Sequence, residues 1–286
     1  MLDYHIIKVS GLDSLAFLQG LITNDINKLE DNMVYNAMLT SKGRYIFDFF
    51  VIQKNGCYYL VIDKVFLDSL VKKLNFYKLA SKVIIETIDN YVVLQAKQLF
   101  DTSNLLDINI YKDPRLPELG YKIITTKDNL EHISKENILS QQEYQNLCFS
   151  LGVLEGSNLP QNIIPIEFGL DELNAISYTK GCYLGQELTN SAKNRLAIRK
   201  KLIIINISNL SNSQRSKIVV NGIVFSIKNE EIGYIVAVNA LYAICLVKMS
   251  GILDNAVKPF KPHQIIIEGA EFNIEVPYYI NDFILD

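Results

Sequence analysis

The chain has 286 residues and a formal net charge of −3 at pH 7, with 49% hydrophobic and 21% charged residues. This composition is that of an ordinary globular protein, long enough for one large domain or two modest ones. The near-neutral charge excludes the broad basic field that nucleic-acid binding requires, so we expect no direct nucleic-acid partner.

The four cysteines, at positions 57, 148, 182 and 245, include no Cys-x-x-Cys pair, and the chain has only three histidines. This spacing excludes a disulfide framework and a self-contained zinc or iron–sulfur site, so we predict no resident metal. No secretory signal pattern is visible, and no apolar run approaches the roughly 20 residues of a membrane span. We therefore expect a cytoplasmic protein without a membrane partner.

The first 200 residues mix helical and strand-like patterns. Helical spacing of apolar residues predicts helices over 13–22, 65–74, 141–151 and 186–194, the first capped by Asp13. Apolar runs predict strands over 5–9, 34–39, 45–54, 57–63, 83–87, 91–95 and 120–125, and a β-like stretch over 175–179. Asn55-Gly56 predicts a tight hairpin. Hairpins mixed with helices are typical of an α+β fold.

The pattern changes near residue 200, where helical periodicity is lost. Short strands are predicted over 202–207, 218–220, 223–227, 232–238, 243–248 and 272–276, with a polar loop over 208–216. This spacing indicates a small all-β barrel. We expect an α+β domain over 1–200 and a β-barrel domain over 201–286.

The most informative run lies just before this change and reads Lys180-Gly181-Cys182-Tyr183-Leu184-Gly185-Gln186-Glu187. Its glycines permit tight turns and close approach of a ligand to the backbone. Cys182 would lie near the N-terminus of the helix over 186–194, where free amides favour a thiolate, and Lys180 would strengthen the effect. We interpret Cys182 as a reactive or ligand-binding cysteine; a small buried cysteine in a turn is the alternative.

Two turns carry further candidates. Asn24 and Asp25, after the first helix, could match the donors and acceptors of a polar ligand edge. Arg44, after Gly43, could pair with a carboxylate. Ordinary turns with solvated side chains are the alternative for both.

Three other features have weaker interpretations. Glu155 and Glu167 are candidate general acids or bases, although neither has an adjacent acid. A basic stretch near the end of the helix over 186–194 is typical of a solvated face, with a phosphate-bearing or acidic partner as the alternative: Lys193, Arg195, Arg199, Lys200 and Lys201. A cysteine hydrolase would need a histidine base near Cys182, for which the sequence gives no recognisable setting.

The segment over residues 178–189 resembles the signature of the YgfZ family of folate-binding proteins. Mitochondrial relatives of that family assist iron–sulfur cluster assembly, and the family is related to the glycine-cleavage T-protein, an aminomethyltransferase. Blocks over 9–25, 39–44, 164–167 and 231–247 are similar to the family in order and spacing. The resemblance implies a T-protein-like fold, a bound tetrahydrofolate or one-carbon derivative, transient contact with an iron–sulfur cluster, and iron–sulfur client or assembly proteins as partners.

The resemblance also implies roles for particular residues. Cys182 and Lys180 would be the working groups, and folate would contact a larger set: Asn24, Asp25, Gly43, Arg44, Glu167, Gly181, Gly185, Gln186 and Glu187. The chain departs from the family at Cys148, Ser191 and Leu196, where an arginine, an arginine and a glycine are usual.

The resemblance also shows three departures from the T-proteins, one of which is Cys182, where T-proteins typically have an aspartate. Their adjacent aspartates read here as Phe47-Asp48, and their Arg-x-Glu step reads Cys148-Phe149-Ser150. We therefore expect an accessory tetrahydrofolate-binding factor that supports iron–sulfur cluster assembly or repair, including clusters of tRNA-modifying enzymes. A folate-dependent aminomethyl or one-carbon transferase is the alternative, and a pure scaffold would bind no folate.

Overall fold

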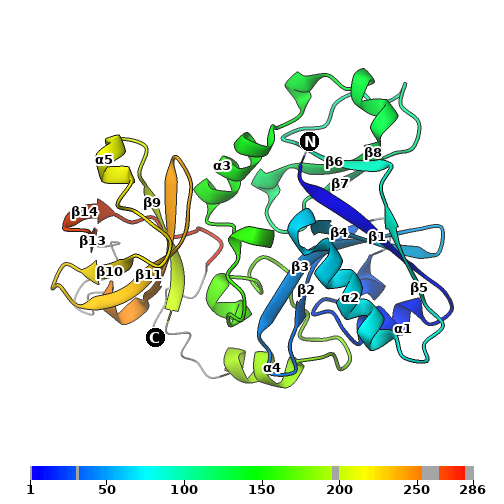
Figure 1. The fold of residues 1–286 in the computed structure, drawn as a ribbon, viewed down its shortest axis with the longest axis horizontal. Helices are drawn as coiled ribbons and strands as arrows, with labels where there is room; N and C mark the ends of the chain where they lie inside the picture. The colour runs from blue at the N-terminus through cyan, green and yellow to red at the C-terminus, as the bar shows by residue number, and fades with distance from the viewer. Residues whose placement is uncertain (1, 30–31, 195–199, 253–263, 281–286) are drawn as a thin grey trace.

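The computed structural model describes the chain except residues 1, 30–31, 195–199, 253–263 and 281–286 (Figure 1). Among the described residues, none of the helices combines the length and apolar character that a membrane crossing needs.

A five-stranded antiparallel sheet, in the order β2-β3-β4-β1-β5, forms the N-terminal layer. Its strands are β1 (Tyr4–Ser10), β2 (Met33–Leu39), β3 (Tyr45–Lys54), β4 (Cys57–Asp63) and β5 (Ile84–Ile88). Helices α1 (Ser14–Gln19) and α2 (Leu67–Lys78) cover one face, where alternate strand residues such as Ile7, Phe49 and Ile62 pack with Leu18 and Leu70. The predicted hairpin is confirmed, since Asn55 and Gly56 both have positive φ angles.

A second, three-stranded sheet in the order β6-β8-β7 consists of β6 (Tyr91–Ala96), β7 (Ile108–Lys112) and β8 (Tyr121–Thr126). It is followed by α3 (Gln141–Leu151), whose predicted bounds are confirmed. The reason is local: Ser140 and Glu143 form a capping box at the start, and Gly152 ends the helix in the left-handed conformation.

The C-terminal region is a six-stranded sheet in the order β14-β13-β10-β11-β12-β9. Its strands are β9 (Lys200–Asn206), β10 (Ile223–Ser226), β11 (Glu231–Val238), β12 (Tyr242–Lys248), β13 (Gln264–Ile267) and β14 (Ala270–Asn273). A bridge between Ile204 and Glu275 connects β9 to the chain beyond β14. The sheet is therefore a half-barrel, which confirms the expected all-β character, while the domain boundary at 200/201 stays a prediction.

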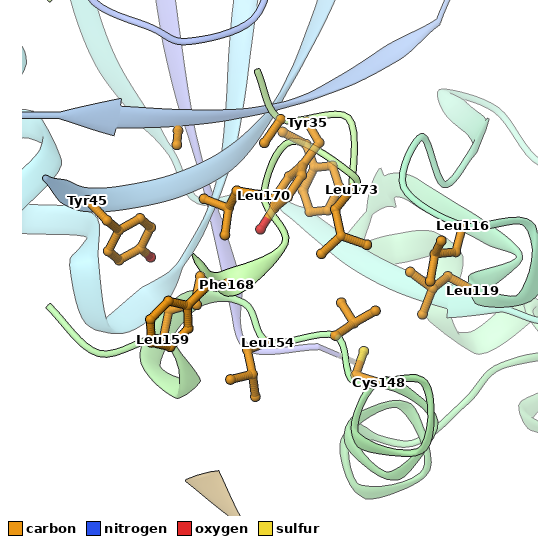
Figure 2. Packing of buried hydrophobic residues seen from close by; sticks show 14 of the residues in the cluster. Tyr35, Tyr45, Leu116, Leu119, Cys148, Leu154, Leu159, Phe168, Leu170 and Leu173 are labelled. Atoms are coloured by element: carbon orange, nitrogen blue, oxygen red, sulfur yellow. The ribbon is translucent and has the colours of Figure 1, made fainter. Parts of the chain in front are cut away.

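One hydrophobic core connects these layers. Residues of the first two sheets and of α3 pack there with Leu202, Val236 and Leu246 of the half-barrel. Figure 2 shows Phe168 and Leu170, from the segment before the signature, among the buried side chains of this core. The segment that leads into the signature is thus held at the junction between the N-terminal layers and the half-barrel.

Some local predictions are wrong. Residues 175–179 form no strand, because their backbone instead joins the turn after α1 (Ser177 N donates to Thr23 O, 3.0 Å). Residues 218–220 form no strand, and the loop over 208–216 contains α5 (Asn212–Arg215), whose start is capped by Ser211. Asp13 does not cap α1 through its side chain, which accepts from Lys82 N.

Candidate functional site

Lys180 is the anchor of the signature loop. Its ammonium donates to three backbone carbonyl oxygens at the C-terminal end of α1 and the turn after it: Gln19 (2.9 Å), Ile22 (2.7 Å) and Asn24 (2.9 Å). The carbonyl end of a helix favours a cation, and three acceptors use all the donors of an ammonium group. Burial lowers the pKa of Lys180 to about 8. Lys180 therefore fastens the loop to α1, and this differs from the predicted role of holding the thiolate.

Cys182 is exposed, whereas Cys148 and Cys245 are buried and Cys57 is partly buried. Burial raises the pKa of the Cys148 and Cys245 thiols. The loop is also fixed beyond the cysteine, since Leu184 N donates to Gly20 O (3.0 Å). Cys182 thus lies between two anchors and presents its side chain to solvent, as a ligand-binding cysteine requires.

Helix α4 (Gln186–Asn194) begins after the loop, and its predicted bounds are confirmed. The side-chain oxygen of Gln186 accepts from Tyr183 N (3.3 Å), so Gln186 stabilises the entry to the helix. Glu187 and Gly181 are exposed. These residues shape the loop around Cys182 and its outer surface.

Two glycines far apart in sequence pack against each other. Gly185 has a φ of +85°, and a Cβ there would lie 2.5 Å from Thr40 O and 3.1 Å from the Cα of Gly43. Gly43 has a φ of +64° and faces Gly185 O and Leu188. Only glycine permits this approach, so the β2–β3 turn lies directly against the signature loop.

Asn24 and Asp25 hold the turn after α1. The side-chain nitrogen Nδ2 of Asn24 donates to Tyr35 O (2.9 Å) and Asn174 O (2.7 Å). Asp25 Oδ1 accepts from the side chain of Gln19 (2.6 Å). Most of the hydrogen-bonding atoms of these two side chains thus have partners within the protein.

Arg44, Glu167 and Lys200 line a cleft of about 680 Å³ between the segment over 157–168 and strands β9 and β11. Among the described residues, none of these three side chains takes part in an ion pair. Burial raises the pKa of Glu167, and the two cations oppose that shift. Further polar groups line the wall: Asn158, Gln161, Asn162, Asn221 and Tyr234.

The predicted site residues thus form two groups. Arg44 and Glu167 lie in the cleft, whereas the described residues that line it do not include Cys182, Lys180, Asn24 or Asp25. The β2–β3 turn connects the groups, because Gly43 contacts the loop and the next residue lines the cleft.

A network of buried charged side chains, which the sequence analysis did not predict, packs against the main hydrophobic core. The guanidinium of Arg115 pairs with Asp113 (2.7 Å) and with Glu155, and it donates to Tyr144 (2.8 Å). The side chains of Arg115, Asp113 and Lys122 are fully buried. Asp113-Pro114-Arg115 in a loop is the one sequence signal that could have suggested it.

Glu155 is not suited to general acid catalysis. Burial by itself would raise the pKa of its carboxyl, but Arg115 and Lys122 lower it to about 2. Glu155 is therefore ionised at neutral pH and serves as the counter-charge of Arg115. The same two cations lie near Cys148, where the family usually has an arginine.

Asp48 is the one aspartate that this chain keeps of the adjacent pair in T-proteins, and its carboxylate is hydrogen-bonded within the protein. It accepts from the hydroxyls of Tyr35 (2.7 Å) and Tyr45 and from Gly156 N (2.9 Å). Burial raises its pKa. Ser150, at the glutamate position of the T-proteins, donates to Leu147 O (2.8 Å). Neither residue offers free acid–base capacity.

The arrangement of sheets and half-barrel defines a protein of the T-protein fold. The structure is similar to the crystal structure of glycine cleavage system aminomethyltransferase T from Bartonella henselae, with a TM-score of 0.71 and 13% identity, covering 96% of this chain and 82% of that one. At this identity the likeness shows the fold alone.

Sequence comparison identifies the relatives. The chain is 31% identical to the mitochondrial iron–sulfur cluster assembly factor IBA57 homolog of Mycosarcoma maydis, over 69% of this chain and 54% of the relative. The IBA57 homolog of Dictyostelium discoideum is 30% identical (69% and 59% covered), and mouse IBA57 is 28% identical (69% and 62%). The chain is a homologue of the IBA57 iron–sulfur cluster assembly factors of the YgfZ family, which confirms the predicted resemblance.

Two further findings qualify this comparison. No family model matches the chain, and the chain spans between 54% and 62% of the length of the relatives named here. The expected cytoplasmic location is wrong, because each of these relatives is named as a mitochondrial protein.

Proposed function

We propose that this protein is an accessory factor that supports the assembly or repair of iron–sulfur clusters in client enzymes, with Cys182 as its working group. The observation that carries the proposal is the exposed thiol on a loop fastened at Lys180 and Leu184. Thiolates are soft ligands that suit iron–sulfur clusters. Homology to the IBA57 assembly factors supports the same role.

One cysteine cannot hold a cluster that needs four ligands. Among the described residues, no group of three or more histidine, cysteine or acidic side chains could hold a metal ion. We therefore propose that an assembly or client protein supplies the remaining ligands and that contact with Cys182 is transient. On the family resemblance, the clients include iron–sulfur enzymes of tRNA modification.

Depletion of the protein from cells tests this role. We expect the activities of iron–sulfur enzymes to fall and to recover when the wild-type chain is returned, while enzymes without clusters keep their activity. Unchanged iron–sulfur activities after depletion would contradict the proposal.

We further propose that tetrahydrofolate or a one-carbon derivative binds in the cleft lined by Arg44, Glu167 and Lys200. The volume of about 680 Å³ lies in the range typical of small-molecule sites. Arg44 and Lys200 suit the carboxylates of the folate tail, and the amides along the wall suit a ring with several donors and acceptors. Bound folate would supply a carrier for one-carbon groups.

The residues at the positions of the T-protein acids favour an accessory role over one-carbon transfer. Asp48 is held by two tyrosines, and Ser150 stands where T-proteins have a glutamate. A transferase would need acid–base groups facing the cleft, and Glu167 is the one carboxyl among the described residues that line it.

Thermal unfolding tests the folate site. A folate concentration near 100 times Kd should stabilise the native state by about 2.7 kcal/mol, a Tm increase of about 5 °C. Arg44→Met should weaken binding about tenfold, because a guanidinium–carboxylate pair is lost.

Lys42→Met is the matched control, since Lys42 is an exposed residue of the same turn and does not line the cleft. We expect this variant to bind as the wild type does. An absent Tm shift at saturating folate, or equal binding by both variants, would count against the assigned cleft.

A further inference from the structure

An exposed basic surface lies on α2, and not near the end of α4 where the sequence pattern favoured it. Lys201 of β9 is 1% exposed and its ammonium pairs with Glu172, so it is not part of a solvated face. Lys200 lines the cleft, and residues 195–199 lie outside the described part of the chain.

Residues 67–82, which span α2 and the turn to β5, carry a local excess of positive charge. They include one acid, Asp68, and four lysines, whereas the whole chain has a net charge of −3. Among the described residues, none of these lysines takes part in an ion pair: Lys72, Lys73, Lys78 and Lys82. Asp13 accepts from Lys82 N (2.7 Å) and adds one negative charge, while Glu86 is balanced by Lys8 (3.2 Å). Four lysines against two unbalanced carboxylates leave the surface net positive.

Large apolar side chains project from the same surface. Leu79 is 88% exposed, Leu12 87% and Phe76 70%. Phe76 lies one helical turn after Lys72, on the outer face of α2, because the opposite face is buried through Leu70. The exposed face of α2 thus carries a cation and an aromatic ring side by side.

Leu12 joins this surface through a contact between two turns. Asp13 N donates to Lys82 O (3.4 Å), and a Cβ on Gly11 would lie 2.2 Å from the same oxygen. The β1–α1 turn that contains Leu12 therefore packs directly on the α2–β5 turn, which begins at Leu79. Leu12 and Leu79 project from two turns that are in contact.

The backbone at Leu79 gives a second, independent observation. Leu79 has φ 44° and ψ −119°, a conformation that glycine adopts readily and a leucine adopts only with strain. Its side chain is exposed, so no packing within the described chain offsets this strain. The side chain is therefore suited to a partner outside the chain.

The chemistry of the surface favours a lipid bilayer over a folded protein. Protein interfaces are poor in lysine and enclose their apolar anchors in shaped pockets. Here the four cations are all lysines, and the apolar side chains project outward. Anionic headgroups attract lysines, and projecting phenylalanine and leucine side chains enter the boundary between headgroups and acyl chains.

We propose that the outer face of α2 and the adjoining β1–α1 turn dock on a bilayer that contains anionic phospholipid. Leu12, Phe76 and Leu79 enter the headgroup boundary, and the four lysines lie against the phosphates. The expectation of no membrane partner followed from the lack of a spanning run, and a surface contact needs none. The contact does not rest on the proposed function, because it involves neither Cys182 nor the cleft.

Co-sedimentation of the full chain with vesicles tests the charges. Vesicles of phosphatidylcholine with about one third phosphatidylglycerol should bind at least about tenfold more tightly than phosphatidylcholine alone. Salt at about 1 M should remove most of this difference, because the Debye length falls to about 3 Å. Lys72→Gln together with Lys82→Gln should weaken binding about 25-fold, or about fivefold per lysine. Lys217→Gln together with Lys228→Gln, at exposed lysines of the half-barrel, is the control and should bind as the wild type does.

Two further variants test the apolar contacts. Phe76→Ser together with Leu79→Ser should weaken vesicle binding about 30-fold, whereas Leu106→Ser, at a leucine that is 85% exposed elsewhere, should leave it unchanged. Leu79→Gly separates binding from folding. Its Tm should not fall, because glycine adopts this φ without strain, while its binding should fall about fivefold.

Equal binding to anionic and neutral vesicles would overturn the proposal, as would losses in the control variants as large as those in the α2 variants. Retention of the wild type on heparin without binding to anionic vesicles would identify a soluble acidic partner instead and would equally overturn it.

Discussion

Arg115→Ala is expected to lower the free energy of unfolding by about 3–5 kcal/mol, because it leaves Asp113 and Glu155 as buried charges without their main counter-ion. The guanidinium also packs 5.0 Å from the ring centre of Tyr35 and 4.8 Å from that of Phe50, so its removal opens a space in the core as well. Urea unfolding of the purified variant measures the effect.

Two control variants distinguish the effect of burying an ion pair from the effect of removing a charge. Lys8→Ala breaks a partly exposed ion pair with Glu86 and should leave the urea midpoint close to that of the wild type. Arg115→Lys keeps the charge but loses the two-pronged contact with Asp113, so it should recover only part of the loss. A midpoint for Arg115→Ala close to that of Lys8→Ala would show that the network does not stabilise the fold.

Lys180→Met should have the second-largest effect, about 2–3 kcal/mol. Hydrogen bonds to a charged group are strong, and this variant leaves the carbonyls of Gln19, Ile22 and Asn24 without their common donor. Methionine preserves most of the apolar stem, so the loss reports the ammonium. We expect reduced urea stability and faster amide exchange in the signature loop.

Lys28→Met is the matched control, since Lys28 is an exposed lysine whose ammonium lies 3.5 Å from Thr179 of the same segment. It should leave both stability and exchange close to the wild type. Unchanged exchange in the loop of Lys180→Met would refute the anchoring role of Lys180.

The sequence predicts well what local chemistry decides. The hairpin at Asn55-Gly56 follows from the backbone freedom of that pair, and α3 follows from its capping box and its terminal glycine. The strands β7 and β13 are not predicted, although β10, which is as short as β13, is predicted. The stretch over 175–179 has strand-like composition, but its backbone is used by the turn after α1.

The candidate site also depends on contacts between residues far apart in the sequence, which the sequence alone does not predict. The signature motif identifies Cys182 and Lys180, but the carbonyls that bind Lys180 lie 156–161 residues earlier in the chain. Arg115 and Glu155 are charged residues, for which exposure is the ordinary expectation, and their burial depends on partners brought together by the fold. The separation of the cleft from the cysteine loop likewise follows from tertiary packing.

Rescue of depleted cells tests most directly whether the thiol of Cys182 is the functional group of this protein. Iron–sulfur enzyme activity would be measured in cells that carry the wild type, Cys182→Ser or Cys57→Ser at equal abundance. We predict that the wild type and Cys57→Ser restore activity and that Cys182→Ser does not. Equal rescue by Cys182→Ser would contradict the account and leave Cys182 as a turn residue.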